Sequence, residues 1–185
     1  MAIMSAQTVA ELRAAVDDPT VVARYWSHIV RGTERQCWLW TGAISGKGHG
    51  RFQLSDRRVV NGPGGPFRQT FVVIAHRFGY ALHHGVDALL DVPIVAHNCD
   101  NPLCQNPACW RASNHRANGQ DHGRRRDIVA GPLADVRGAR GRARAVRQAA
   151  RDGLPVEEAV LAGLRPVHRA QVALFAIEPI DPKED

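Results

Sequence analysis

The segment VAHNCDNPLCQNPACWRASNHRANGQD, Val95 to Asp121, most constrains how this chain can fold. It contains three cysteines, two histidines and several asparagines, and its apolar residues follow neither the helical nor the strand period. Such a segment cannot fold by burying one hydrophobic face. We therefore expect a cross-link other than a hydrophobic core to hold it in a single shape.

The cysteine spacing points to a bound metal ion. Cys99, Cys104 and Cys109 follow one another with four residues between neighbours, and Cys37 stands far upstream. Four thiolates around zinc form a closed tetrahedral site, and the binding energy of that ion becomes folding energy. The alternatives are two disulfides or buried unpaired thiols. A reducing compartment argues against disulfides, and polar surroundings argue against buried thiols. We predict one structural zinc ion bound by Cys37, Cys99, Cys104 and Cys109.

The charge of the chain favours a polyanionic partner. The formal net charge is +6, and nearly all of the positive charge is arginine, whose planar fork suits phosphate oxygens. The alternative is the codon bias of a GC-rich genome, which favours arginine and alanine. The start, MAIMSAQTVAELR, lacks the pattern of a signal peptide, and no apolar run approaches the roughly 20 residues of a membrane span. We expect a cytoplasmic protein with no membrane partner.

The order of the patterns predicts an α+β fold. Residues 6–30 have helical spacing interrupted by Pro19, with Gly32 as a possible C-cap. From Cys37 onward, CWLWTG, GRFQL, FRQTFVVIA, VPIVAH and CWRA are typical of strands, and NGPGGP is typical of a loop. Helices are expected over 76–85 and over 113–126, the latter with Ser113 as N-cap. The predicted organisation is a helical segment 1–34, a central domain 35–127, a basic helical region 128–178 and a disordered acidic tail 179–185.

The motif HNCDNPLCQNPACW, followed by Asn118, resembles the His-Cys box homing endonucleases and the wider HNH (ββα-metal, or His-Me finger) nucleases. CWLWTG, GHGRF and AHRFGYALHHG are typical of the same group, so the resemblance covers about half of the chain. It implies a zinc-stabilised ββα-metal core with an antiparallel sheet and flanking N- and C-terminal helices. The chain departs from the family at two positions. Cys109 replaces a frequent histidine ligand, and Ala96 replaces a frequent aspartate.

The resemblance implies a divalent-metal-dependent endonuclease that cuts double-stranded DNA, acting as a homodimer because one active site cuts one strand. His97 would be the general base, a role that suits imidazole. Asn118 would hold Mg²⁺. The zinc loop between them would fix their separation. Alternatively, His97 is a structural residue or a zinc ligand. The rival functions are a non-catalytic zinc-stabilised DNA-binding protein and an RNA-directed nuclease of the same fold.

Further site residues have two interpretations each. Arg51 resembles the family arginine near the scissile phosphate, or it is a backbone-phosphate contact or a surface residue. Asn106 orients His97, or it forms an Asx turn before Pro107. His76 packs beside the site or takes part in it. His83, His84, His115 and His122 are expected on solvated faces.

Two stretches are candidate DNA contacts. The first is basic and is either a phosphate-binding surface or a solvated helix face; its residues include Arg124, Arg125, Arg126, Arg140 and Arg144. The second is a β-ribbon that would enter the major groove and would offer Arg57, Arg58, Arg68 and Gln69 to the bases. Two helices are expected after Arg140 with a glycine between them, and a helix-turn-helix formed by these two helices is a further alternative.

Overall fold

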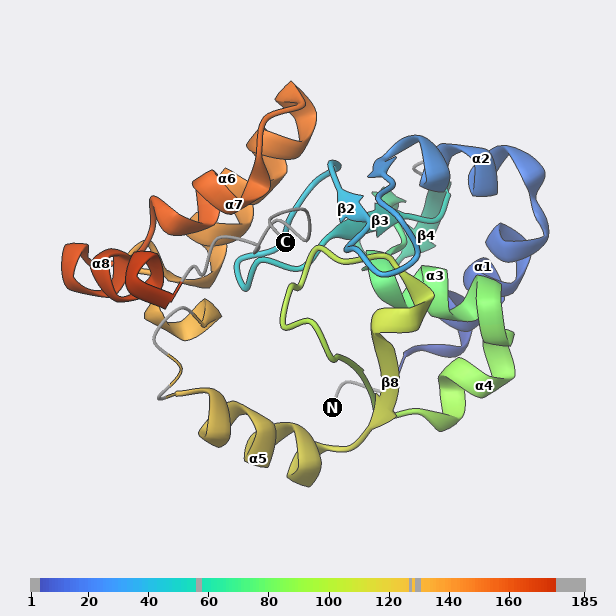
Figure 1. Ribbon diagram of the computed structural model, residues 1–185. Coiled ribbons are helices and arrows are strands. Elements are labelled where there is room, and N and C mark those ends of the chain that lie inside the picture. Colours follow the sequence, from blue (N-terminus) through green and yellow to red (C-terminus); the bar gives the residue numbers. More distant parts are fainter. Residues whose placement is uncertain (1–3, 56–57, 127, 129–130, 176–185) are drawn as a thin grey trace.

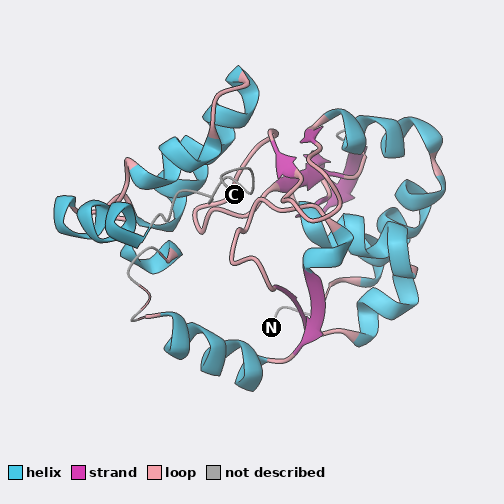
Figure 2. Cartoon of the chain, in the orientation of Figure 1, coloured by secondary structure: helices cyan, strands magenta, loops and turns pink. Residues whose placement is uncertain are grey.

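The structure is a computed structural model that describes residues 4–55, 58–126, 128 and 131–175. The described chain combines helices with short antiparallel strand pairs, which confirms the mixed α+β class (Figure 1, Figure 2). Within the described residues the strands form two-stranded sheets, β1–β2, β3–β6, β4–β5 and β7–β8. The predicted tail 179–185 lies outside the described residues.

Two capped helices open the described chain. α1 spans Ala6–Asp17, and α2 spans Pro19–Ser27. The carboxylate of Asp18 accepts a hydrogen bond from Thr20 N–H at 2.8 Å, and Pro19 occupies the first turn, where a missing N–H costs nothing. Pro19 therefore separates the helices as predicted. Gly32 is not the cap, because α2 ends at Ser27 and the chain continues into a strand.

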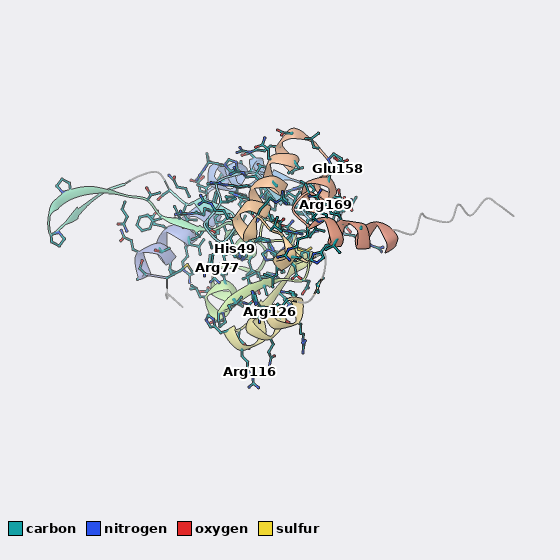
Figure 3. The ribbon with its side chains drawn as sticks, turned by 90° about the vertical axis from the view of Figure 1, so that its left-hand side faces the viewer. His49, Arg77, Arg116, Arg126, Glu158 and Arg169 are labelled. Carbon is teal, nitrogen blue, oxygen red and sulfur yellow. The ribbon has the colours of Figure 1, made fainter. Side chains whose placement is uncertain are left out.

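Short strands connect these helices to the centre of the molecule. β1 (Ile29–Val30) pairs with β2 (Leu39–Trp40), and β3 (Arg51–Gln53) pairs with β6 (Val72–Ile74). β4 (Arg58–Gly62) and β5 (Gly65–Gln69) form a hairpin that extends away from the body (Figure 3). FRQTFVVIA was predicted as one strand but is divided between β5 and β6. Phe71 turns into the core at the break, with 3% of its surface exposed.

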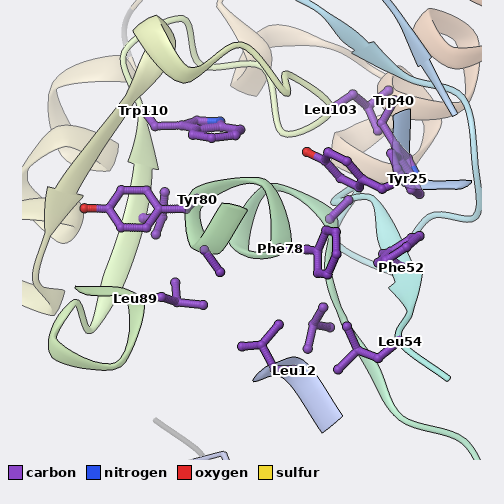
Figure 4. Close-up of a cluster of buried hydrophobic side chains, with 14 of the residues drawn as sticks. Leu12, Tyr25, Trp40, Phe52, Leu54, Phe78, Tyr80, Leu89, Leu103 and Trp110 are labelled. Carbon is purple, nitrogen blue, oxygen red and sulfur yellow. The ribbon is translucent and has the colours of Figure 1, made fainter. Parts of the chain in front are cut away.

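The core surrounds α3, which spans Ala75–His84 and is followed by α4 (Val86–Asp91) (Figure 4). The Phe78 ring lies 4.5 Å from the Phe52 ring and 5.0 Å from the Tyr25 ring, centroid to centroid. Gly79 lets two aromatic side chains approach the helix, since a Cβ there would lie 2.5 Å from the Trp110 ring and still closer to the Tyr25 hydroxyl. The helix thus joins the N-terminal helices to the strand that carries Trp110.

A strand, a loop, a second strand and a helix follow. β7 (Ile94–His97) pairs antiparallel with β8 (Trp110–Ser113), and His97 lies opposite Trp110. The loop between them includes the 3-10 turn η1 (Pro107–Cys109). α5 spans His115–Arg125 and starts at Asn114, whose side chain accepts a hydrogen bond from Ala117 N–H at 2.9 Å. Ser113 was the predicted cap, but it stays in β8, paired with Ile94.

Helices also complete the C-terminal part. The turn η2 (Pro132–Ala134) precedes α6 (Gly138–Asp152), α7 (Val156–Leu161) and α8 (Pro166–Phe175). α6 docks on the loop after β2, where Arg147 donates to Gly42 O at 3.2 Å and Arg151 donates to Thr41 O at 2.9 Å. In the described part of the chain, no helix combines the length and apolarity needed to cross a bilayer.

Candidate metal centre and the adjoining pocket

The four cysteines form one compact cluster that can hold a metal ion such as zinc. The Sγ atoms of Cys37, Cys99, Cys104 and Cys109 all lie within 4.8 Å of one another, and all four thiols are free. Ligands of a regular tetrahedron with Zn–S bonds of about 2.3 Å are separated by about 3.8 Å, so the cluster has the size of such a site. A single group of four, in place of two bonded pairs, is the arrangement of a metal site.

The electrostatics of the cluster call for a cation. Hydrogen bonds from the thiols of Cys104 and Cys99 lower the pKa of Cys37 to about 4. The same contacts with Cys37 and Cys99, together with burial, raise the pKa of Cys104. Ionisation of Cys37 is therefore favoured at the expense of Cys104. A metal cation removes this conflict, because it stabilises all four thiolates at once.

Backbone pairing brings Cys37 to the other cysteines. Trp40 N–H donates to Leu103 O at 3.0 Å, and Gln105 N–H donates to Trp38 O at 2.7 Å, so the cysteine loop runs beside β2. Gln105 is fully buried, and its side-chain oxygen accepts a hydrogen bond from the Tyr25 hydroxyl at 2.8 Å. Sequence reasoning did not identify this glutamine, which attaches the loop to α2.

Asn106 braces the same loop. Its Nδ2 donates to Glu34 O and Gln36 O, both at 2.7 Å, and its Oδ1 accepts from Ala108 N–H at 3.0 Å. The last bond is the Asx turn that was one of the two interpretations of this residue. The hydrogen bonds of the carboxamide go to backbone groups around the cysteines and not to His97. The position of Asn106 is therefore that of a structural clamp.

His97, the last residue of β7, is held in one tautomer. Its Nε2 lies 3.1 Å from Cys104 O, and because a carbonyl only accepts, Nε2 carries the proton and Nδ1 keeps a lone pair. Burial lowers the pKa of His97, while the charge of Cys99 and the carbonyl contact oppose that shift. The imidazole is thus neutral near pH 7. The metal-binding group consists of the four cysteines without His97.

A cavity of about 890 Å³ adjoins the cysteine loop and brings together the two residues with the main predicted roles. His97 and Asn118 both line it, from β7 and α5 respectively. His122, one helical turn after Asn118, lines it as well; it is exposed, as predicted. The spacing of four residues from Asn118 is the sequence signal that could have placed His122 on the same side of the helix.

A row of histidines forms another part of the cavity wall. The rings of His49 and His76 are 5.6 Å apart and those of His76 and His97 are 4.5 Å apart, centroid to centroid. Burial holds the pKa of His76 well below its ordinary value, and the neighbouring histidines lower it further. Its buried Nδ1 has no hydrogen-bond partner among the described residues.

Asp100 is a second residue that sequence reasoning missed. One carboxylate oxygen pairs with Arg125 Nε at 2.7 Å, while Oδ1 is buried and has no hydrogen-bond partner in the described part of the chain. Burial raises the pKa of this carboxyl, and the charge of Arg125 opposes the shift. Asp100 and Arg125 both line the cavity. The ion pair also fixes α5, none of whose side chains is buried, to the cysteine loop.

The predicted DNA contacts are distributed unevenly. Arg51 is exposed and does not line the cavity. It pairs across the strands with Ile74, which does line the cavity, so Arg51 lies beside the rim. Gln69 is half-buried at the end of β5. Arg57 and the side chains of Arg58 and Arg68 lie outside the described part. Exposed arginines occur at the end of α5 and on α6, namely Arg124, Arg126, Arg140 and Arg144.

Comparisons with known proteins give one partial similarity. No family profile matches the chain, and no solved structure matches it. The chain is 29% identical to Protein 2.8 of Escherichia phage T7 over 92 residues, which cover 50% of this chain and 52% of the phage protein. The match thus spans about half the length of that relative, whose name states no activity.

Proposed function

We propose that this protein is a divalent-metal-dependent endonuclease that hydrolyses phosphodiester bonds in double-stranded DNA, with zinc as a structural ion. The observation that carries the proposal is the shared cavity of His97 and Asn118, with the cysteine cluster in the loop between them. In this interpretation β7, β8 and α5 are the ββα-metal core of the HNH and His-Cys box nucleases.

His97 has the properties of a general base. The Cys104 carbonyl fixes the proton on Nε2, so Nδ1 accepts a proton from water, which attacks phosphorus in line. The neutral imidazole is available near pH 7 because burial lowers the pKa of His97. Because the Cys104 carbonyl belongs to the cysteine loop, a metal bound by the cysteines would also fix the orientation of the base.

The cavity offers donors suited to a hard divalent cation. Asn118 supplies a carboxamide oxygen from α5, and Asp100 supplies a buried carboxylate oxygen that has no hydrogen-bond partner. Oxygen donors of this kind fit Mg²⁺. Ala96 stands where many relatives of the suggested family have an aspartate, and Asp100 restores a carboxylate to the pocket. When bound, the ion would neutralise charge on the scissile phosphate and on the departing oxygen.

A plasmid assay tests the proposal. Supercoiled DNA is incubated with the protein in Mg²⁺, in EDTA, and in EDTA followed by excess Mg²⁺. Nicked or linear product is expected only when Mg²⁺ is available. His97→Ala should slow the reaction by about 100-fold or more, since it removes the base. The matched control is His115→Ala, because His115 is exposed at the start of α5 outside the cavity lining.

Three outcomes would contradict the proposal. Equal cleavage by the His97→Ala protein would remove His97 from the mechanism. Tight duplex binding without cleavage under any divalent cation would identify a non-catalytic DNA-binding protein. Preferential cleavage of structured RNA in a parallel digest would assign the activity to the RNA-directed class.

A further inference from the structure

The two last described helices are connected by a turn of the length found in a helix-turn-helix. α7 (Val156–Leu161) and α8 (Pro166–Phe175) are separated by four residues, Ala162 to Arg165. A helix-turn-helix joins two helices by a turn of three or four residues that often contains glycine, and its second helix enters the major groove. Here the glycine is Gly163. α6 runs beside α7 as the third helix of the unit (Figure 1).

The turn is closely packed. Leu164 is 2% exposed, and its N–H donates to Leu161 O at 3.0 Å. A Cβ on Gly163 would clash with the Asp135 carboxylate, so no larger residue fits there without a shift. Arg169, on α8, reaches back to the turn and donates to Leu164 O at 3.0 Å and to Ala162 O at 2.6 Å. These contacts fix the start of α8 relative to α7.

The first turn of α8 is presented to solvent. Val167 is 61% exposed, among the most exposed large apolar side chains of the described chain, and Arg165 is exposed two residues before it. An apolar side chain at the start of a recognition helix can contact the methyl group of thymine. Arg165 beside it is suited to a phosphate or to a guanine.

The charge of the unit complements nucleic acid. Residues 138–170 contain seven arginines and three acidic residues. A second cavity, of about 410 Å³, lies between the end of α5 and α8 and is lined by Arg126, Arg165 and His168. Within residues 4–55, 58–126, 128 and 131–175, the buried Nδ1 of His168 has no hydrogen-bond partner.

The carboxylate in this second cavity does not cancel its positive charge. Asp135 is paired with Arg137, which donates to both of its oxygens at 2.9 and 2.7 Å. The second cavity is therefore suited to a phosphate group. Leu133 lines both cavities, so the basic surface beside α8 continues from the pocket that contains His97.

We propose that α6, α7 and α8 form a second DNA-binding unit, in which α8 enters the major groove, Val167 contacts base edges, and Arg126, Arg165 and His168 hold a backbone phosphate. The proposed nuclease would then select its site through this unit and cut at the other pocket. The inference rests on the proposed function for its choice of duplex DNA as the partner. Binding by this unit does not require cleavage.

The test is selection from a randomised 20-base-pair duplex library by the full-length protein in EDTA, followed by fluorescence anisotropy with the enriched duplex and with a scrambled duplex. Val167→Gln should weaken binding to the enriched duplex by about 10-fold, leave the scrambled duplex unaffected and change the enriched motif. Arg165→Ala should weaken both duplexes and reduce the slope of log affinity against log salt by about 1. Leu154→Gln is the matched control, since Leu154 is 58% exposed in the same unit but lies between α6 and α7.

The outcomes separate this inference from the nuclease proposal. If the enriched motif depends on Val167 but the plasmid is never cut, the binding unit stands and the nuclease proposal fails. If the plasmid is cut but Val167→Gln and Arg165→Ala leave motif, affinity and salt slope unchanged, the inference about α8 is wrong. Enrichment of no motif by the unsubstituted protein would overturn base reading by α8.

Discussion

Replacing Asn106 separates a structural role from a catalytic one. Its carboxamide makes three hydrogen bonds to backbone groups, with Glu34 O, Gln36 O and Ala108 N–H. Each buried bond contributes about 1 kcal/mol, and each group left without a partner costs a further 1–3 kcal/mol unless water reaches it. Glu34 and Gln36 lie in exposed chain, so water offsets part of the loss there. Asn106→Ala should therefore lower the free energy of unfolding by about 3 kcal/mol.

Asn106→Asp should be at least as disruptive. The aspartate keeps the acceptor for Ala108 N–H but turns a carboxylate oxygen toward two carbonyl oxygens that Asn106 now contacts through its donor. Both variants should also release zinc to a chelator at lower chelator concentration, since Asn106 holds the chain next to Cys37 against the cysteine loop.

The measurements are urea unfolding of the zinc-loaded protein and titration with a colorimetric zinc chelator. Asn98→Ala is the matched control. Asn98 is exposed in the same loop, and its replacement should change the free energy of unfolding by less than about 0.5 kcal/mol. A variant Asn106→Ala that keeps full stability and zinc affinity but loses more than about 100-fold in cleavage would show that Asn106 acts in catalysis and that this reasoning is wrong.

Four further predictions follow from the same contacts. The protein should contain one zinc ion per chain, and Cys104→Ser should lose both the zinc and the cooperative unfolding transition; a folded, zinc-free variant would contradict this. Because burial lowers the pKa of His97, the single-turnover cleavage rate should be constant from about pH 8 down to about pH 6.5, the ordinary pKa of histidine, and should fall only below that pH. A midpoint of the pH profile above about 6.5 would exclude a buried neutral base. Burial also lowers the pKa of His76, so below about pH 6.5 His76 is protonated in the unfolded state but stays neutral in the folded state. The free energy of unfolding should therefore decrease as the pH falls below about 6.5. His76→Gln should flatten that dependence. Gly79→Ala should destabilise the fold by about 3 kcal/mol in thermal unfolding, because its methyl group would overlap the Tyr25 hydroxyl; an unchanged melting temperature would mean that the aromatic core yields easily.

Local sequence signals predicted most of the elements but not where some of them stop. Pro19 was predicted to interrupt the helical pattern, and that prediction is correct, because α1 ends at Asp17 and Asp18 caps a new helix that starts at Pro19. FRQTFVVIA has strand-like residues throughout. Its local sequence does not predict the break between β5 and β6, where the side chain of Phe71 packs into the core. The N-cap of α5 was predicted at Ser113 and is observed at Asn114. Ser113 instead belongs to β8, where it pairs with Ile94, a residue far away in the sequence.

The sequence by itself predicted that Cys99, Cys104 and Cys109 belong to one metal site and that His97 and Asn118 lie at one pocket. The segment is too polar to form a hydrophobic core, and its cysteine spacing indicates that a bound metal ion holds it together. The motif around His97 and Asn118 indicated the two pocket residues. Only the tertiary structure decided that Cys37 joins the other three thiols, since pairing of the cysteine loop with β2 is a long-range contact. It also decided the tautomer of His97, the unpaired oxygen of Asp100 and the clamp made by Asn106. Hydrogen-bond partners and burial depend on which distant chain segments meet, and no local pattern encodes that meeting.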